Sequence, residues 1–162
     1  MGRVPASILF VCTGNTCRSP MAAAICTSLV AQGYPEYIDK IKILSAGCAA
    51  MDGSPAAPEA VTAMAAKGLA IKSHRARQID KQLLAEADLV VTMGEGHLRR
   101  VTSEWPWAAE KTYTLRELAD EDGDVIDPLG RGSEFYQQTG EELERLLRIM
   151  LKSVLGEPEK MD

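Results

Sequence analysis

The sequence predicts an α/β fold in which helices cover both faces of a parallel sheet, and two observations predict it. Short apolar runs rich in β-branched residues alternate along the chain with segments whose apolar residues recur at helical spacing. Alternating strands and helices are typical of a parallel sheet, because a parallel pair needs a crossover between its strands. With 162 residues, 46% of them hydrophobic, the chain is expected to form one domain over residues 1–162, with a short flexible tail at about 156–162.

The first part of the chain predicts a strand, a tight loop and a helix. Residues 7–11 form a short apolar run that is typical of a buried strand. After the loop, Ser19 is a preferred helix N-cap and Pro20 suits the first helical position. We therefore expect a helix from there to about Gln32, and Gly33 favours its end at that point.

Strands and helices continue to alternate through the rest of the chain. Asp80 is the expected N-cap of a short helix that reaches residue 87. A long last helix is expected at 133–155, because its apolar residues fall on one face. These residues are Leu143, Leu146, Leu147, Met150, Leu151 and Val154. The other expected elements are strands at 41–46, 88–93 and 111–114, helices at 58–67 and 95–102, and an Asp- and Gly-rich loop at 120–132.

Composition and charge exclude several classes of partner. The formal net charge of −5 argues against a nucleic-acid partner, since proteins that bind nucleic acid non-specifically are normally basic. No apolar run approaches the length of a membrane span or a signal-peptide core, so we expect no membrane partner and a cytoplasmic location. The chain is expected to be a monomer.

The cysteines and histidines point away from a disulfide scaffold and from a metal. The chain has four cysteines, Cys12, Cys17, Cys26 and Cys48. They are too few for a disulfide scaffold, and in the cytoplasm they are expected to be mostly reduced. The Cys12–Cys17 spacing is not that of a zinc motif, and His74 and His97 complete no ligand pattern with it. No metal and no cofactor are therefore expected.

The residues suited to chemistry lie in the loop 12–18, between the first strand and the first helix. Ligands of open α/β sheets bind beyond the carboxyl ends of the strands, where a helix N-terminus offers free N–H groups. Gly14 and Asn15 best tolerate the left-handed backbone that a tight cradle requires. Arg18 can hold two phosphate oxygens with its planar guanidinium. Because no Gly-Lys-Ser/Thr follows, the loop predicts a cradle for one phosphate-sized anion and not an NTPase loop.

Cys12 is expected at the base of this cradle, where the loop N–H groups and Arg18 favour its thiolate. A thiolate in that position can attack phosphorus in line and form a phosphocysteine. Ser19 is expected to hydrogen-bond the sulfur and stabilise it as a leaving group. Two interpretations remain open for Cys17: a small loop residue, or a redox partner that forms a reversible disulfide with Cys12. Cys26 and Cys48 are expected in the helix core and in a loop, without a catalytic role.

Residues 11–20, VCTGNTCRSP, resemble the active-site loop of the low-molecular-weight protein tyrosine phosphatase family. Four further segments stand in the family's order: Ser45-Ala46-Gly47, SHRAR at 73–77, ADL at 87–89 and Asp127-Pro128. The resemblance implies a three-layer fold with a four-stranded, twisted parallel sheet. It also implies Cys12 as nucleophile, Arg18 as the clamp on the transition state, and Asp127 as the acid that protonates the leaving group and then activates water.

The same resemblance assigns binding and supporting residues. The phosphoryl oxygens would be held by the amides of the loop residues Thr13, Gly14, Asn15, Thr16, Cys17 and Arg18. A supporting hydrogen-bond network would consist of Asn15, Ser19, Ser45 and His74. Arg18 and the amides already supply the positive field, so the resemblance implies no metal or cofactor.

Two positions bear on the substrate. Tyrosine-specific members usually carry a larger aliphatic residue where this chain has Thr16, and threonine there is similar to the bacterial protein-arginine phosphatases of the family. After Asp127-Pro128, tyrosine phosphatases usually place aromatic residues that wall the phenol ring, whereas this chain reads Leu129-Gly-Arg131-Gly. The arginine phosphatases carry an aromatic residue where Leu129 stands, so this position departs from both branches.

The predicted function is therefore removal of phosphoryl groups from phosphoarginine in phosphorylated proteins. The alternative is a low-molecular-weight tyrosine phosphatase. A thiol-dependent arsenate reductase is disfavoured because no cysteine follows Cys48. A non-catalytic phosphate-binding module is disfavoured because both Cys12 and Asp127 are present. A pure redox sensor that uses Cys12 and Cys17 is a further, less favoured alternative. The role of Arg131 stays open, and Trp105-Pro106-Trp107 is expected to be partly buried.

Overall fold

The computed structural model describes residues 2–160 and contains a four-stranded sheet in which every neighbouring pair is parallel. The strands are β1 (Ser7–Cys12), β2 (Lys42–Gly47), β3 (Leu89–Thr92) and β4 (Thr112–Thr114). Their spatial order is β2-β1-β3-β4, which places β1 in the interior of the sheet. The expected four-stranded parallel sheet is confirmed. Because all strands run the same way, their carboxyl ends meet at one edge, where Cys12 pairs with Gly47.

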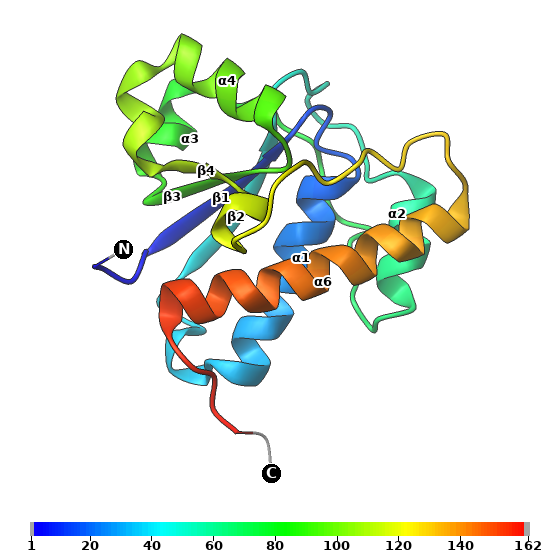
Figure 1. The fold of residues 1–162 in the computed structure, drawn as a ribbon. Helices are drawn as coiled ribbons and strands as arrows, with labels where there is room; N and C mark the ends of the chain where they lie inside the picture. The colour runs from blue at the N-terminus through cyan, green and yellow to red at the C-terminus, as the bar shows by residue number, and fades with distance from the viewer. Residues whose placement is uncertain (1, 161–162) are drawn as a thin grey trace.

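Helices cover both faces of this sheet, as the sequence predicts (Figure 1). One face carries α1 (Arg18–Gly33), α2 (Pro58–Ala65), α5 (Leu115–Leu118) and α6 (Ser133–Leu155). The other carries α3 (Lys81–Glu86) and α4 (Glu95–Glu104). Two short 3-10 turns, η1 (Pro35–Tyr37) and η2 (Pro106–Lys111), complete the elements among the described residues.

Alternation along β1 divides the core into two clusters. Ile8 and Phe10 pack in the cluster that holds α1 and α6, whereas Leu9 and Val11 pack in the cluster that holds α3 and α4. Successive side chains of a strand point to opposite faces, so a strand covered on both sides is apolar throughout. The end of β1 is consequently held from both faces, and this rigid end carries Cys12. The six apolar residues predicted to line one face of α6 are all buried.

The start of α1 differs from the expectation. The helix begins at Arg18, with Cys17 at the N-cap position, and Met21 N–H donates to Cys17 O at 3.1 Å. Ser19 is therefore not the cap, and its position in the first turn leaves its hydroxyl free for another partner.

Two further features go beyond the sequence prediction or qualify it. The four-residue helix α5 is not among the expected elements, although Thr114 caps it by accepting from Glu117 N–H. Trp105 is half-buried, but Trp107 is 47% exposed, so the expected partial burial holds for the first tryptophan better than for the second.

Residues 156–160 lie within the predicted flexible tail, and they return to the end of α1. Glu159 N–H donates to Gly33 O at 2.7 Å, and Tyr34 Oη donates to Gly156 O at 2.9 Å. Met161 and Asp162, the rest of that tail, lie outside the described residues. None of the helices described between residues 2 and 160 has the length and apolar character to cross a membrane.

Candidate active site

The loop that follows β1 is fixed by its own backbone carbonyls. Cys12 O accepts from Cys48 N–H, Thr13 O from Ala49 N–H, and Thr16 O from Ala57 N–H, each at 2.9 Å. Cys12 itself is 2% exposed. The loop is thus held from the side of the segment that follows β2, and we refer to residues 12–18 as the phosphate loop.

Asn15 is the centre of the hydrogen bonds that shape this loop. It is buried and takes a left-handed conformation with φ 57°, whereas Gly14, also expected there, does not. Its Nδ2 donates to Ser19 Oγ at 2.8 Å and to Ser45 Oγ at 3.0 Å, and its Oδ1 accepts from Arg77 N–H at 3.0 Å. Asparagine tolerates this conformation better than most residues, and the three bonds hold it there.

His74 adds a fourth contact to Asn15. Its Nε2 donates to Asn15 O at 2.7 Å, since a carbonyl can only accept. Burial lowers the pKa of His74, with smaller contributions from the Arg77 and Arg75 guanidinium groups, although the bond to Asn15 opposes the shift. The structure therefore brings together the four residues of the expected network, Asn15, Ser19, Ser45 and His74.

Ser19 lies where it can stabilise a thiolate. Its Oγ is 2.8 Å from Cys12 Sγ and 3.5 Å from Ala46 O. The hydroxyl already accepts from Asn15, and its single hydrogen can be donated either to Ala46 O or to the closer Cys12 sulfur. A Cys12 thiolate has no hydrogen, so Ser19 must be the donor when the thiolate forms. Ser19 thus does not cap the helix, and its hydroxyl lies next to the sulfur instead.

Arg18 connects the phosphate loop with the segment that carries Asp127. Its side chain is nearly buried: Nη1 donates to Val125 O at 2.9 Å, and Nη2 lies 3.6 Å from Asp127 Oδ2. The Asp127 side chain is 47% exposed, and its Oδ1 accepts from Leu129 N–H at 3.1 Å. The carboxyl group therefore lies beside the guanidinium and open to solvent, where a substrate's leaving group would arrive. We call residues 124–132 the acid loop.

Cys17, near the end of the phosphate loop, is buried. Its Sγ lies 3.3 Å from Tyr136 Oη and 3.7 Å from Thr16 Oγ1. Burial raises the pKa of the Cys17 thiol, although the bonds from Tyr136 and Thr16 oppose the shift. All four cysteines are free, and burial raises the pKa of Cys26 to about 12 and that of Cys48 to about 11. Thiols of this kind are poor nucleophiles at neutral pH, because the thiolate is the reactive form.

The two predicted specificity residues lie at the edge of the site. Thr16 is half-buried in the phosphate loop, and Leu129 in the acid loop is 66% exposed. Arg131 is exposed, and its guanidinium stacks over the Phe135 ring at 5.1 Å. The aromatic ring that follows the acid loop thus makes a cation–π contact with a cation of this chain.

Three residues that contact this site were not identified from the sequence as site residues. Arg77 N–H bonds Asn15, His97 Nε2 lies 2.9 Å from Thr13 Oγ1, and Asp124 Oδ1 accepts from Glu95 N–H at 2.9 Å. His97 and Asp124 follow β3 and β4 along the chain, on the carboxyl side of each strand, which is the available signal for them.

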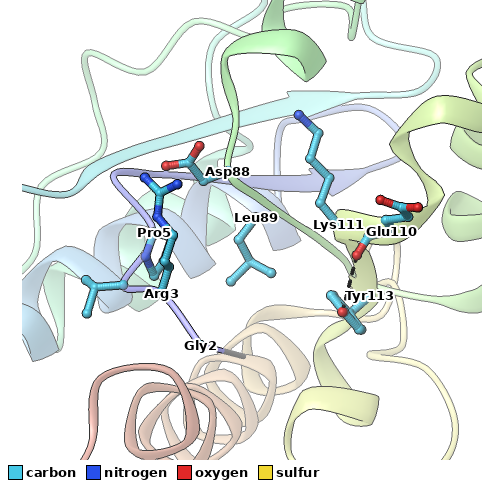
Figure 2. Close-up of a pocket in the computed structure, with 9 residues that line it drawn as sticks. Gly2, Arg3, Pro5, Asp88, Leu89, Glu110, Lys111 and Tyr113 are labelled. Carbon is cyan, nitrogen blue, oxygen red and sulfur yellow. Dashed lines mark hydrogen bonds between the residues drawn. The ribbon is translucent and has the colours of Figure 1, made fainter.

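A separate hollow of about 300 Å³ lies at the other edge of the sheet (Figure 2). It is lined by the N-terminal segment and by residues just before or at the start of β3 and β4, among them Asp88, Leu89, Lys111 and Tyr113. Because the strands are parallel, this edge is opposite to the one that carries Cys12. Within residues 2–160, no group of three or more His, Cys, Asp or Glu side chains is arranged to hold a metal ion.

Known proteins resemble this chain in both sequence and fold. The family described as low molecular weight phosphotyrosine protein phosphatase matches residues 7–160. The protein-arginine-phosphatase of Bacillus subtilis (strain 168) is 38% identical over 91% of this chain and 95% of its own length. That of Geobacillus stearothermophilus is 39% identical over 89% of this chain and 93% of its own length. A solved structure of the YwlE arginine phosphatase, a cysteine-to-serine mutant with a phosphorylated active-site serine, matches with a TM-score of 0.84 and 38% identity, covering 90% of this chain and 93% of the other.

Proposed function

Because the chain belongs to the low-molecular-weight phosphotyrosine protein phosphatase family, we propose that it removes phosphoryl groups from phosphoarginine in proteins through a phosphocysteine intermediate. Cys12 is the nucleophile, Arg18 holds the phosphoryl group, and Asp127 is the general acid. The amides of residues 13–18 complete the cradle. No metal or cofactor takes part in this proposal.

In the first step, the Cys12 thiolate attacks phosphorus and forms the S–P bond while the P–N bond breaks. The electron pair of that bond goes to the guanidino nitrogen, which takes a proton from the Asp127 carboxyl group. A guanidino nitrogen leaves poorly as an anion, so proton donation by Asp127 carries much of this step. The position of Asp127, exposed and 3.6 Å from Arg18, supports this role.

In the second step, water attacks the phosphocysteine. The Asp127 carboxylate takes a proton from the water, the O–P bond forms, and the S–P bond breaks to return the thiolate. Ser19 stabilises that departing sulfur, because its Oγ lies 2.8 Å from Cys12 Sγ. The YwlE mutant supports the intermediate, since the serine in place of its active-site cysteine is phosphorylated.

Two features of the site bear on the substrate: the residues that follow Asp127-Pro128 and the hydroxyl of Thr16. A phenol ring gains affinity by stacking on aromatic side chains, but Leu129 follows Asp127-Pro128 and the Phe135 ring already makes a cation–π contact with Arg131. Thr16 offers a hydroxyl beside the cradle, which suits a planar group with several N–H donors better than an aromatic ring. The Thr16 hydroxyl is the observation that carries the proposal, and the two relatives named protein-arginine-phosphatase support it.

The decisive experiment compares one peptide phosphorylated on arginine with the same peptide phosphorylated on tyrosine. We expect kcat/KM for the phosphoarginine peptide to exceed that for the phosphotyrosine peptide by at least about 100-fold, a difference in transition-state binding of about 3 kcal/mol. The Cys12→Ser variant is the blank. A preference for phosphotyrosine would make the chain a tyrosine phosphatase with a bare pocket wall.

We also propose that the enzyme acts as a monomer in the cytoplasm on phosphorylated proteins. A reducing compartment keeps the Cys12 thiol available, and all four cysteines are free. The net charge of −5 disfavours nucleic acid as a partner. Size-exclusion chromatography with light scattering tests the oligomeric state.

A further inference from the structure

The first turn of α4 touches both loops of the site, and neither contact has a role in the two chemical steps. His97 Nε2 lies 2.9 Å from Thr13 Oγ1, on the residue that follows the nucleophile. Two residues earlier, Glu95 N–H donates to Asp124 Oδ1 at 2.9 Å, at the start of the acid loop. A single helical turn thus connects the phosphate loop with the acid loop.

The direction of the His97–Thr13 bond follows from the surroundings of the ring. Burial and the Arg18 guanidinium lower the pKa of His97 to about 4, although Asp124 and Asp127 oppose the shift, so the ring is neutral near pH 7. Its Nδ1 is buried and has no hydrogen-bond partner among residues 2–160. An orphaned buried N–H is rarer than an under-used acceptor, so the proton belongs on Nε2. His97 then donates to Thr13 Oγ1, and the Thr13 hydroxyl keeps its own hydrogen for an acceptor in the site.

Asp124 is fitted closely against the start of α4. Gly94 is the N-cap residue of that helix, and a Cβ at this position would lie 2.8 Å from the Asp124 carboxyl carbon. Such a contact is too short, so a side chain at residue 94 would displace the Asp124 carboxylate from its place at Glu95 N–H. The carbonyl of Asp124 is held as well, since it accepts from Arg116 Nε at 3.1 Å.

Val125, the residue after Asp124, is anchored through both of its backbone polar groups. Val125 N–H donates to Met93 O at 2.8 Å, and Val125 O accepts from Arg18. Beyond Val125 the loop is exposed, apart from buried Pro128. The position of Asp127 therefore depends on the anchors at 124 and 125.

We propose that the first turn of α4 sets the acid loop relative to the phosphate loop, with His97 and Asp124 as positioning residues. The inference rests on the proposed function, because Asp127 is the acid whose placement Asp124 controls. His97 acts through Thr13 on phosphoryl binding, whatever the leaving group is. Asp124 acts through Asp127, so its effect on the first step depends on how much the leaving group needs a proton. The two contacts thus predict two different kinetic patterns.

Asp124 is tested with two substrates that differ in their leaving group. Asp124→Ala is expected to lower kcat/KM for a phosphoarginine peptide, which reports on the first phosphoryl transfer, about 30-fold, part of the effect of a general acid. On p-nitrophenyl phosphate, whose phenolate leaves without a proton, the loss is expected to stay below about 3-fold. Asp124→Asn keeps the Oδ1 acceptor and should restore most of the activity, while Gly94→Ala should behave as Asp124→Ala. The matched control is Asp122→Ala, an exposed residue just before the loop, which should change neither rate.

His97 is tested by a rescue and a double-mutant cycle. His97→Leu is expected to lower kcat/KM about 10-fold on both substrates, because the lost hydrogen bond orients the loop that binds the phosphoryl group. His97→Gln, whose amide N–H can reach the position of Nε2, should restore it. Thr13→Val should match His97→Leu, and the double variant should lose no more than either single one.

The outcomes separate this inference from the proposed substrate. An equal loss of kcat/KM on both substrates in Asp124→Ala would overturn the positioning role of Asp124, and additive losses in the His97 and Thr13 variants would overturn that of His97. If the wild type hydrolyses p-nitrophenyl phosphate but not phosphoarginine, the proposed substrate fails. The leaving-group comparison is then made with phenyl phosphate, whose phenolate leaves poorly, in place of phosphoarginine.

Discussion

The phosphate loop and the acid loop meet at one site but are held in opposite ways. Asn15, in the phosphate loop, is buried and hydrogen-bonds to side chains or backbone of four other residues. Asp127, in the acid loop, is half exposed, and its carboxylate contacts only Leu129 N–H and Arg18 among the described residues. A cradle for a transition state gains from being fixed in advance. An acid that must donate to a leaving group and then accept from water gains from access to solvent.

Oxidation has the largest expected effect, because it would break the phosphate loop from within. We expect hydrogen peroxide to abolish activity by joining Cys12 and Cys17 in a disulfide, and a thiol reductant to restore it. Cys17 would have to leave its contact with Tyr136, so Tyr136→Phe should form the disulfide faster. Mass spectrometry of the oxidised protein measures the product. Irreversible sulfonic acid at Cys12 alone would contradict the prediction.

Asp127→Asn removes the proposed acid from the exposed acid loop. Asp127→Asn is expected to lower kcat on phosphoarginine about 1,000-fold, because asparagine cannot donate the proton that the leaving nitrogen needs. Thermal stability should change little, since the side chain is half exposed. Steady-state kinetics and a melting curve measure both quantities. A large fall in melting temperature would show that the acid loop is as tightly built as the phosphate loop.

Asn15→Ala removes the side chain at the centre of the buried phosphate loop. The change leaves the Arg77 N–H without its partner and removes the amide donor from Ser19 and Ser45. We expect a loss of about 2 kcal/mol in the free energy of unfolding and a roughly 50-fold lower kcat/KM. Urea unfolding and kinetics on the same samples check these values. The control is Gln137→Ala, which removes an exposed side-chain amide and should change neither quantity.

Lowering the pH should reduce the free energy of unfolding through His97, which lies between the two loops. Its pKa in the folded chain is about 4, below the ordinary value of about 6.5, so the unfolded chain binds the proton more readily. The stability that His97 contributes is therefore complete above pH 6.5 and is lost as the pH falls from 6.5 to 4. Because solvent screens part of the effect, we expect the wild type to lose about 1.5 kcal/mol more than His97→Gln between pH 7 and 4.5, measured by urea unfolding. Parallel curves for the two proteins would contradict this.

The smallest effect is expected at Thr16, on the rim of the phosphate loop. Thr16→Ile removes the hydroxyl and adds apolar surface, so preference should shift toward phosphotyrosine by about 10-fold in the ratio of kcat/KM values. The measurement is the assay with the paired phosphoarginine and phosphotyrosine peptides. An unchanged ratio would mean that Thr16 does not select the substrate.

Local patterns predict the fold well. Strand runs such as 7–11 and the apolar face of α6 depend on neighbours within the same element, so periodicity is enough to find them. Asp80 is identified as an N-cap for the same reason, and it does accept from Leu83 N–H. The capping role predicted for Ser19 is wrong, because a buried hydroxyl can serve a partner distant in sequence as well as a helix end, and here its partner is Cys12.

The contacts of the site are less accessible from sequence. Cys12, Arg18 and Asp127 belong to motifs whose order resembles the family's. His97 and Asp124 belong to no such motif, and each meets a residue far away in the chain. The Thr13–His97 contact spans 84 positions, and the Glu95–Asp124 contact spans 29. Such pairs become visible only once the strands of the sheet are placed in order.

The burial of Cys12 also predicts that the site selects substrates by the length of the phosphorylated side chain. The residue is 2% exposed at the end of β1, while Leu129 stands 66% exposed at the rim. We expect a phosphoryl group on a short stem, as in phosphoserine, to bring the substrate's own backbone against that rim before phosphorus reaches the sulfur. Arginine carries its phosphoryl group at the end of a long, thin chain. Selection by length thus precedes any recognition of the guanidino group, and it needs no contact with it.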